Sequence, residues 1–254
     1  MLDFTNKTVV ITGGGSGIGK SASLLFAKLG AWVHIIELNE ANAQQAMKDI
    51  AAMEGKVIAH ICDVSDQRQV ADVFKKIEVV DVLVNSAGIS HIGKADTTSE
   101  SDFDRLFKVN VKGIYNCLHE AIPLMKAKGN GVILNVCSVA AQTGIADRFA
   151  YSMTKGAVYS MTLSVAKDYL ADHIRCNCVS PARVHTPFVD DFLKKNYPGR
   201  EKEMFDALAK TQPIGRMGTT DEVASMIAYL CSDEASFITG CDYPVDGGFI
   251  KLNT

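Results

Sequence analysis

The chain has 254 residues, of which 47% are hydrophobic and 22% charged, and its 26 basic and 29 acidic residues give a formal net charge of −3. This composition indicates one globular domain, or at most two small ones, and argues against an intrinsically disordered chain. The acidic excess argues against a protein that grips nucleic-acid phosphates, and no apolar run approaches the ~18 residues of a membrane span, so we expect neither partner.

Short runs rich in Val, Ile and Leu alternate with longer stretches of helical periodicity along the whole chain. Strands are predicted at 8–12, 32–37, 57–62, 82–86, 132–138, 174–180 and 243–246. Helices are predicted at 17–29, 39–53, 66–77, 103–128, 151–172 and 220–231. The strands lack clean polar alternation, which is typical of a parallel sheet covered on both faces. The sequence therefore predicts an α/β fold: a single doubly wound domain over residues 1–254, with a seven-stranded parallel sheet and helices on both faces.

Glycines and prolines mark where these elements end. Gly30, Gly55 and Gly129 follow three of the predicted helices, a position that favours a left-handed residue. From residue 181 to about 213 the chain contains several prolines and glycines and no simple strand. We expect residues of about 184–213 to form a mobile flap that covers the substrate.

The seven cysteines are scattered, odd in number and not arranged like a disulfide framework. Cys176 and Cys178 form the only close pair, and in a strand they would share one face. With no further Cys or His at ligand spacing, we predict reduced, structural cysteines and no metal. The first residues also lack the basic and apolar segments of an export signal, so we expect a cytoplasmic protein.

A glycine-rich segment, residues 12–19, follows the first predicted strand and opens the first helix. Glycines there let the backbone approach a pyrophosphate closely, and the helix N-terminus stabilises its negative charge. A merely flexible turn would have a similar composition, but the strand before it and the helix after it favour a dinucleotide-binding Rossmann domain. The predicted contacts are Gly13, Ser16, Gly17, Ile18 and Gly19.

Glu37 lies eighteen residues after Gly19, at the end of the second predicted strand. An acidic residue in this place binds the adenosine ribose hydroxyls and repels a 2′-phosphate. The alternative is a solvated charge at a strand end. Because neither Ser16 nor Leu38 supplies a basic group for a 2′-phosphate, we predict that the cofactor is NAD.

Tyr151 and Lys155 are four residues apart at the start of a predicted helix, so both project from one helical face. A phenol is a weak acid with a pKa near ~10, and a neighbouring ammonium favours its ionised form. Ser138, at the end of the preceding strand, would hydrogen-bond the substrate oxygen that gains or loses the proton. A Tyr–Lys pair alone is more often a surface feature, but the strand-end serine makes acid–base catalysis the better interpretation.

Together these segments resemble the short-chain dehydrogenase/reductase family over essentially the whole chain. The resemblance implies that Tyr151 is the general acid/base, that Lys155 binds the nicotinamide ribose, that Ser138 positions the carbonyl, and that Asn110 holds a water that links the lysine to solvent. It further implies cofactor contacts by Tyr151 and by Asp63, Val64, Asn85, Ala87, Gly88, Val184 and Thr186. It also implies a homotetramer in which the helices predicted at 103–128 and 151–172 pair across subunits.

Two positions depart from the family pattern. Ser86 stands where a second asparagine is usual, and Ala182 replaces the glycine that usually follows Pro181. Serine is small and polar, so the first change puts little in doubt. Alanine lacks the conformational freedom of glycine, which weakens the expected contacts of Val184 and Thr186.

The substrate is the least determined feature. Arg148, three residues before Tyr151, could hold a substrate carboxylate, although a subunit-surface salt bridge is as good an explanation. His91 could donate to a hydroxyl or carboxylate, although a lone loop histidine is more often solvated. Within the family, the chain resembles the 2-keto-3-deoxy-L-fuconate dehydrogenases and the cytosolic (R)-3-hydroxybutyrate dehydrogenase type.

We therefore expect hydride transfer between NAD and a secondary alcohol or ketone of a small hydroxy or keto acid, with a deoxy sugar acid as the first choice. The predicted substrate-binding residues are His91, Ser138, Arg148 and Tyr151. The alternatives are a 3-hydroxybutyrate-type dehydrogenase, a 3-oxoacyl reductase, a neutral sugar or polyol dehydrogenase, and a non-catalytic NAD-binding regulator. A reductase would usually favour NADPH, and a regulator would have no need of Tyr151 and Lys155.

Overall fold

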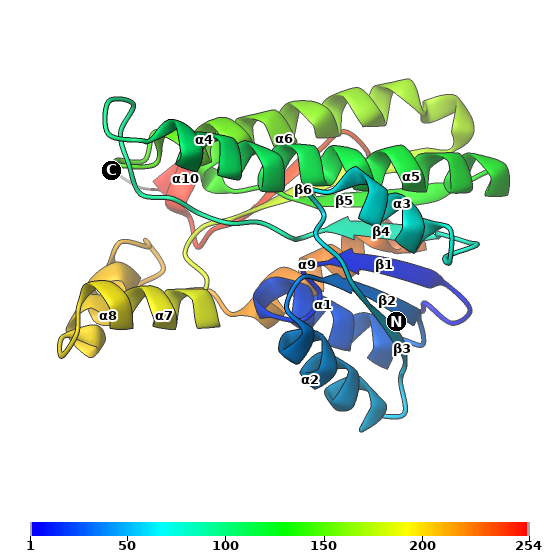
Figure 1. Ribbon diagram of the computed structural model, residues 1–254, viewed down its shortest axis with the longest axis horizontal. Coiled ribbons are helices and arrows are strands. Elements are labelled where there is room, and N and C mark those ends of the chain that lie inside the picture. Colours follow the sequence, from blue (N-terminus) through cyan, green and yellow to red (C-terminus); the bar gives the residue numbers. More distant parts are fainter. Residues whose placement is uncertain (1, 253–254) are drawn as a thin grey trace.

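A computed structural model describes residues 2–252 of the chain (Figure 1). Within that span seven parallel strands form one sheet in the order β3-β2-β1-β4-β5-β6-β7. The strands are β1 (Thr8–Thr12), β2 (Trp32–Glu37), β3 (Lys56–Ile61), β4 (Val82–Asn85), β5 (Gly131–Val136), β6 (Ile174–Pro181) and β7 (Asp242–Val245). The predicted doubly wound α/β fold is therefore confirmed, and the strand order reverses direction between β1 and β4.

Alternate side chains along the central strands enter two separate hydrophobic cores. Val9 and Ile11 of β1 are buried in the core on one face of the sheet, whereas Val10 is buried in the core on the other face. The same alternation sends Ile35 and Ile36 of β2 to opposite faces. Both faces are thus apolar, which explains why the strands lack polar alternation in the sequence.

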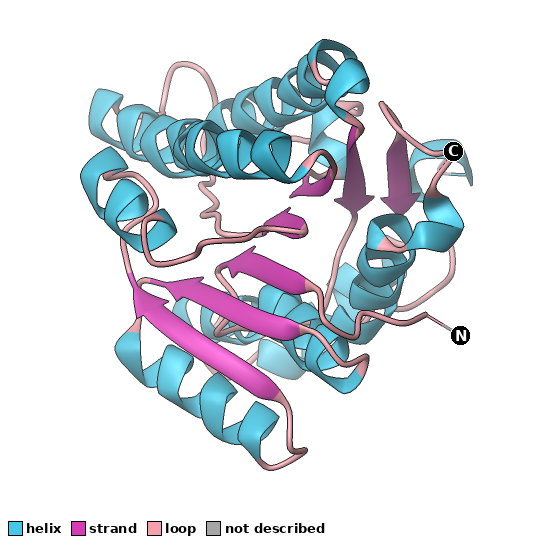
Figure 2. Ribbon diagram, turned by 90° about the vertical axis from the view of Figure 1, so that its right-hand side faces the viewer, coloured by secondary structure: helices cyan, strands magenta, loops and turns pink. Residues whose placement is uncertain are grey.

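Helices cover each face of the sheet (Figure 2). One face carries α1 (Gly17–Lys28), α2 (Glu40–Ala51) and α9 (Thr220–Cys231), whose buried residues belong to the first core. The other carries α3 (Gln67–Phe74), α4 (Glu100–Phe107), α5 (Gly113–Lys128) and α6 (Phe149–Asp168). Between α4 and α5 the chain forms a π-helical turn, η1 (Lys108–Lys112), so the predicted helix 103–128 is interrupted once. Short 3-10 turns, η2 (Val139–Ala141), η3 (Leu170–Asp172) and η4 (Asp233–Ala235), connect further elements.

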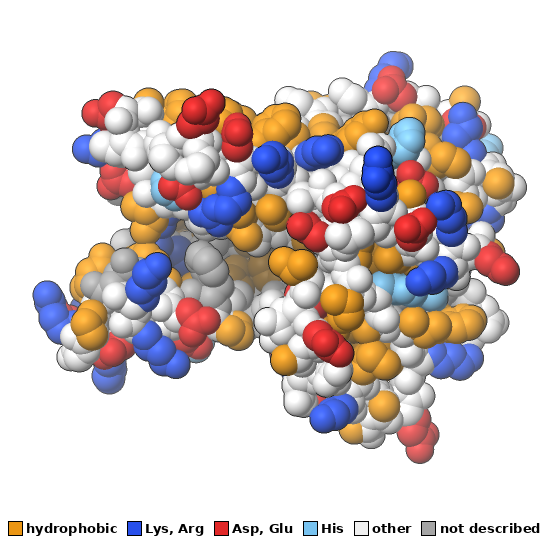
Figure 3. Space-filling view, viewed as in Figure 1, with side chains coloured by type: hydrophobic (Ala, Val, Ile, Leu, Met, Phe, Trp, Pro, Cys, Tyr) orange, Lys and Arg blue, Asp and Glu red, His pale blue; other side chains and the backbone are white. Residues whose placement is uncertain are grey.

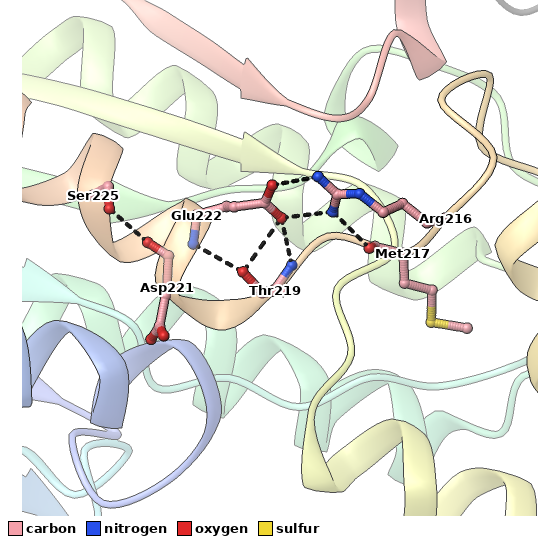
Figure 4. A network of polar contacts seen from close by, with 6 residues as sticks. All are labelled: Arg216, Met217, Thr219, Asp221, Glu222 and Ser225. Carbon is pink, nitrogen blue, oxygen red and sulfur yellow. Dashed lines mark hydrogen bonds and ion pairs between the residues drawn. The ribbon is translucent and has the colours of Figure 1, made fainter.

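Polar caps start several helices. Asp66 accepts hydrogen bonds from the backbone N–H groups of Arg68 and Gln69 in the first turn of α3. Thr219 and Glu222 form a reciprocal capping box at the start of α9, and Arg216 contacts both carboxylate oxygens of Glu222 (Figure 4).

The predicted glycine caps are correct in two cases of three. Gly30 and Gly129 adopt positive φ angles of 91° and 86° after α1 and α5. After α2 the left-handed residue is Glu54, with φ 59°, whereas Gly55 has no positive φ. A Cβ on Gly55 would approach Ile50 Cγ2 to 2.7 Å, so close packing rather than backbone angle explains this glycine.

The segment predicted to be a flap contains two helices that were not predicted, α7 (Pro187–Asn196) and α8 (Glu201–Lys210). They project from one side of the molecule as a small lobe (Figure 1). The last element of the described part of the chain is a short helix, α10 (Phe249–Leu252). Within residues 2–252, no helix is long and apolar enough to span a membrane.

Candidate active site

A cavity of about 580 Å³ opens at the carboxyl ends of the strands, beside the point where the strand order reverses. In parallel α/β sheets ligands bind at this switch point. The loops after β1 to β6 line the cavity, and the segment around α7 and α8 closes one side of it. In the space-filling view the surface is hollowed between this lobe and the body of the molecule (Figure 3).

The glycine-rich loop after β1 is shaped by close backbone contacts. A Cβ on Gly13 would lie 2.9 Å from Ala87 Cα, and a Cβ on Gly19 would lie 2.2 Å from the carbonyl oxygen of Gly13. Gly13 and Gly17 also adopt positive φ angles of 64° and 51°. The five predicted contacts of this loop all line the cavity at the N-terminus of α1. A glycine cradle with a helix N-terminus fits the pyrophosphate of a dinucleotide.

Glu37 is held rigidly at the same end of the cavity. Its side chain is 9% exposed, its Oε2 accepts a hydrogen bond from Gly15 N at 3.1 Å, and its Oε1 accepts one from Asn39 N at 3.1 Å. Each oxygen keeps a free lone pair for a ribose hydroxyl. Asp63 and Val64, after β3, line the cavity too.

Hydrogen bonds inside the sheet fix the loop after β4. Thr12 Oγ1 accepts from Ser86 N and Ala87 N, both at 3.0 Å, so serine at residue 86 keeps this contact through its backbone. Asn85 Nδ2 donates to Asn135 Oδ1 at 2.9 Å. Asn85 is buried in the sheet and does not line the cavity, whereas Ala87 and Gly88 do.

Ser138, Tyr151 and Lys155 line one wall of the cavity. Lys155 Nζ lies 5.8 Å from the centroid of the Tyr151 ring and donates to Val136 O at 2.8 Å. Ser138 Oγ accepts from Ala140 N at 3.2 Å, which holds the hydroxyl at the end of β5. The predicted acid–base residues therefore lie together, and they share the cavity with the glycine-rich loop.

Asn110 lies behind this wall on the π-helical turn η1. Its Oδ1 accepts from Ile89 N at 2.9 Å, and its Nδ2 donates to Ile89 O at 2.9 Å and to Thr154 Oγ1 at 3.1 Å. A Cβ on Gly88 would lie 3.3 Å from Asn110 Oδ1 and 3.8 Å from Lys155 Nζ, so both side chains approach Gly88 on the side where a larger residue would carry its side chain. π-Helical turns frequently occur at functional sites, and this one brings Asn110 beside the lysine.

The predicted substrate residues differ in position. Arg148 lines the cavity, at the residue that precedes α6. His91 does not line it: its Nδ1 lies 3.8 Å from Asp102 Oδ1, and its buried Nε2 has no hydrogen-bond partner. Val184 and Thr186, after β6, line the cavity, and Ala182 has no positive φ, so this turn does not require the usual glycine.

Several cavity residues were not singled out from the sequence, among them Arg183, Gln212, Met217 and Phe249. Arg183 could have been found, because it directly follows a strand at its carboxyl end. Burial lowers the pKa of its guanidinium and that of Arg148. Gln212 and Phe249 reach the cavity from distant segments and carry no local signal.

Two buried thiols lie near the catalytic wall. Cys137 Sγ donates to Lys155 O at 3.2 Å, and a hydrogen bond with Cys178 lowers the pKa of the Cys137 thiol. The same interaction raises the pKa of Cys178. Burial raises the pKa of Cys62, which also lines the cavity, to about 11. All seven cysteines are free thiols.

A dinucleotide cradle beside a tyrosine, a lysine and a strand-end serine defines an oxidoreductase that uses a nicotinamide dinucleotide. Comparison with known proteins agrees. A family model described as enoyl-(acyl carrier protein) reductase matches residues 13–250. The chain is 37% identical over 244 residues to dehydrogenase/reductase SDR family member 6 of Xenopus laevis, covering 96% of this chain and 97% of that protein.

The names of two further similar proteins state the substrates of those proteins. The 2-keto-3-deoxy-L-fuconate dehydrogenase of Xanthomonas campestris is 33% identical over 96% of this chain and 80% of its own length. The crystal structure of L-sorbose reductase from Gluconobacter frateurii, complexed with NADPH and L-sorbose, superposes with a TM-score of 0.94 at 26% identity, covering 99% of each chain. The chain belongs to the short-chain dehydrogenase/reductase family, and it is an oxidoreductase of alcohol and ketone groups that uses NAD or NADP.

Proposed function

We propose that this protein oxidises a secondary alcohol of a small carboxylate-bearing compound with NAD, and that the compound is a deoxy sugar acid related to 2-keto-3-deoxy-L-fuconate. One observation carries the proposal: Ser138, Tyr151 and Lys155 line the same cavity as the glycine-rich loop and Glu37. The acid–base groups thus lie within the space that would hold the cofactor.

The chain's own residues divide the proton chemistry among them. The Tyr151 oxygen accepts the hydroxyl proton of the alcohol, and the Ser138 hydroxyl holds the same oxygen as it becomes a carbonyl. Lys155 places a positive charge 5.8 Å from the tyrosine ring centroid, beside the group that accepts the proton. Asn110, beside Lys155, holds the water that returns protons to solvent. Bound NAD supplies the hydride acceptor.

The choice of NAD over NADP rests on Glu37. A 2′-phosphate near this buried carboxylate would face like charge with little solvent screening. The basic residues that line the cavity are Arg148, Lys155 and Arg183, and they come from the loops and helix near the catalytic wall rather than from β2. The L-sorbose reductase holds NADPH, so the two relatives would differ in this preference.

Arg148 supports an acidic substrate, because it lines the cavity three residues before Tyr151. A guanidinium binds a carboxylate through two parallel hydrogen bonds. A 3-hydroxybutyrate-type acid would use the same group. A neutral sugar such as L-sorbose has no carboxylate for the Arg148 guanidinium to bind, so Arg148 favours a carboxylate-bearing substrate.

We further propose a homotetramer in the cytoplasm, with a flap over the substrate formed by the segment at about 184–213. On α6 the outward face includes Phe149, Gly156 and Leu163. Lys155 is a charged residue within the same stretch, but it is buried and does not belong to this face. Such a face is depleted of charge like the core of an interface. The free thiols fit a reducing compartment.

The test is a panel of candidate alcohols, with initial rates of NADH formation as the readout. It compares 2-keto-3-deoxy-L-fuconate, (R)-3-hydroxybutyrate and sorbitol, each with NAD and with NADP. We expect the largest kcat/KM for the deoxy sugar acid with NAD. A larger kcat/KM for sorbitol, or no NADH from any alcohol, would contradict the proposal.

A further inference from the structure

We propose that Arg183 is a second residue that binds the substrate carboxylate, and that it and Arg148 hold one carboxylate between two guanidinium groups. The inference rests on the proposed function, because it takes the substrate to be an acid. Arg183 lies in the loop between β6 and α7, and Arg148 precedes α6, so the two side chains reach the cavity from different elements.

Arg183 is anchored so that its terminal nitrogens stay available. Its Nε donates to Thr211 Oγ1 at 2.9 Å, and its carbonyl oxygen accepts from Gly218 N at 2.9 Å. Thr211 Oγ1 also accepts from Gln212 Nε2 at 2.9 Å, so the anchor is itself fixed. Within residues 2–252, Nη1 and Nη2 of Arg183 have no hydrogen-bond partner in the protein.

Arg148 is held in a comparable way. Its backbone pairs with Gly93 in a short parallel bridge, in which Gly93 N donates to Asp147 O at 2.9 Å and Phe149 N donates to Gly93 O at 3.1 Å. Its Nη1 donates to Asp147 O at 3.2 Å. Throughout the described chain, its Nε and Nη2 have no protein partner.

Neither guanidinium forms a salt bridge in the described part of the chain, although Tyr151 and the Asp147 carboxylate partly oppose the lowering of the Arg148 pKa by burial. Among the described residues, no carboxylate oxygen lies within 4.0 Å of either guanidinium, although acidic side chains pair with arginines 105, 200 and 216 elsewhere. Both groups are half-buried, and the charge of Arg148 adds to burial in lowering the pKa of Arg183. Two cations that repel each other in one cavity favour an anion between them, and a carboxylate has enough lone pairs to accept from both.

The position of the pair also limits the substrate. Arg148 precedes Tyr151 by three residues, about one helical turn, so the carboxylate would lie near the carbon that reacts. The pair of arginines therefore fits a short hydroxy acid, with its carboxylate a few bonds from the alcohol. A long-chain thioester would present no charge at this place.

Calorimetric titration of the NAD-saturated protein tests the inference without turnover. The probes are acetoacetate and acetoacetamide, ketones of nearly equal size that differ in charge. Replacing Arg183 with Met should weaken acetoacetate binding about 10- to 100-fold, the usual effect of losing a charged hydrogen bond, and leave acetoacetamide binding unchanged. Arg148→Met should have the same effects. In the double variant the fold-loss of acetoacetate affinity should be smaller than the product of the two single losses, because both groups hold one carboxylate.

Lys210→Met is the matched control, since it removes an exposed cation outside the cavity lining and should change neither affinity. Equal losses for both probes in Arg183→Met would assign Arg183 to flap anchoring through Thr211 and overturn the inference. Unchanged acetoacetate binding, or fully multiplicative losses in the double variant, would also overturn it. Failure of the alcohol panel would instead overturn the proposed function, because the calorimetric result does not depend on oxidation.

Discussion

At the scale of single residues, the proposed choice of NAD over NADP rests on Glu37. Its carboxylate is fixed by Gly15 N and Asn39 N before any ligand binds, so little ordering of this side chain remains for cofactor binding. A Cβ on Gly15 would lie 2.9 Å from Glu37 Oε2, so the glycine makes room for this arrangement. Charge and position thus act together at one side chain.

Replacing Glu37 with Ala and Leu38 with Arg should reverse the cofactor preference. The change removes a repelling carboxylate and adds a guanidinium that can bind a 2′-phosphate, so the ratio of kcat/KM for NADP to that for NAD should rise about 100-fold or more. Initial rates with both cofactors provide the measurement. Glu40→Ala is the control, because Glu40 is exposed and does not line the cavity. A wild-type protein that already prefers NADP would contradict this role of Glu37.

Sequence patterns predicted most site residues but not their surroundings. The predicted site residues stand at strand ends or one helical turn apart, so local spacing is enough to identify them. They are the residues of the glycine-rich loop, Glu37, Ser138, Tyr151 and Lys155. His91 lies in a loop whose direction depends on tertiary contacts, and its Nδ1 lies 3.8 Å from Asp102 Oδ1 rather than at the cavity. Gln212 lines the cavity from the loop that follows α8, a placement that no local pattern encodes.

At the scale of elements, short-range signals predicted the sheet and its covering helices well. The flap was harder: α7 and α8 are amphipathic, but each has only ten residues, and the prolines and glycine beside them indicated irregular structure. The π-helical turn η1 was also not predicted, since one additional residue in a helical turn leaves hydrophobic spacing nearly unchanged.

The capping box of α9 makes a pH-dependent contribution to stability. Hydrogen bonds from Arg216 and Thr219 lower the pKa of Glu222 from 4.5 to about 2. A carboxyl group whose pKa is lower in the folded state stabilises the fold above its unfolded pKa and loses that effect as pH falls through its folded pKa. Glu222→Gln should therefore lower Tm at neutral pH, and the difference from wild type should shrink as pH falls from 4.5 toward about 2.

Thermal unfolding across this pH range measures the effect. Glu203→Gln is the matched control, because Glu203 pairs with Arg200 on the exposed surface but does not cap a helix, and its Tm change should be smaller. A Tm difference for Glu222→Gln that stays constant through this pH range would contradict the assignment.

At the scale of the whole molecule, the outward face of α6 is where a second subunit would pack. Gly156 lies on it, and a Cβ there would meet no atom within 4 Å, so a larger residue fits within one protomer. Gly156→Glu should keep the protomer folded and shift the mass measured by light scattering from a tetramer to a smaller species, because it places a charge in an apolar interface.

Gly144→Glu is the control, since Gly144 is exposed and also has open space around its Cα, but lies outside α6. An unchanged tetramer in Gly156→Glu would exclude this face from the interface. A monomeric wild-type protein would contradict the proposed assembly altogether.

The most direct test of the whole account is the activity of Tyr151→Phe with the best alcohol of the panel. Removing one oxygen deletes the proton acceptor but leaves the cofactor cradle intact, so kcat should fall at least about 100-fold while the Kd for NADH, from its fluorescence, stays unchanged. Tyr159→Phe, on the same helix but not in the cavity lining, should keep full activity. A Tyr151→Phe enzyme with wild-type kcat would contradict the central claim that this phenol moves the substrate's proton.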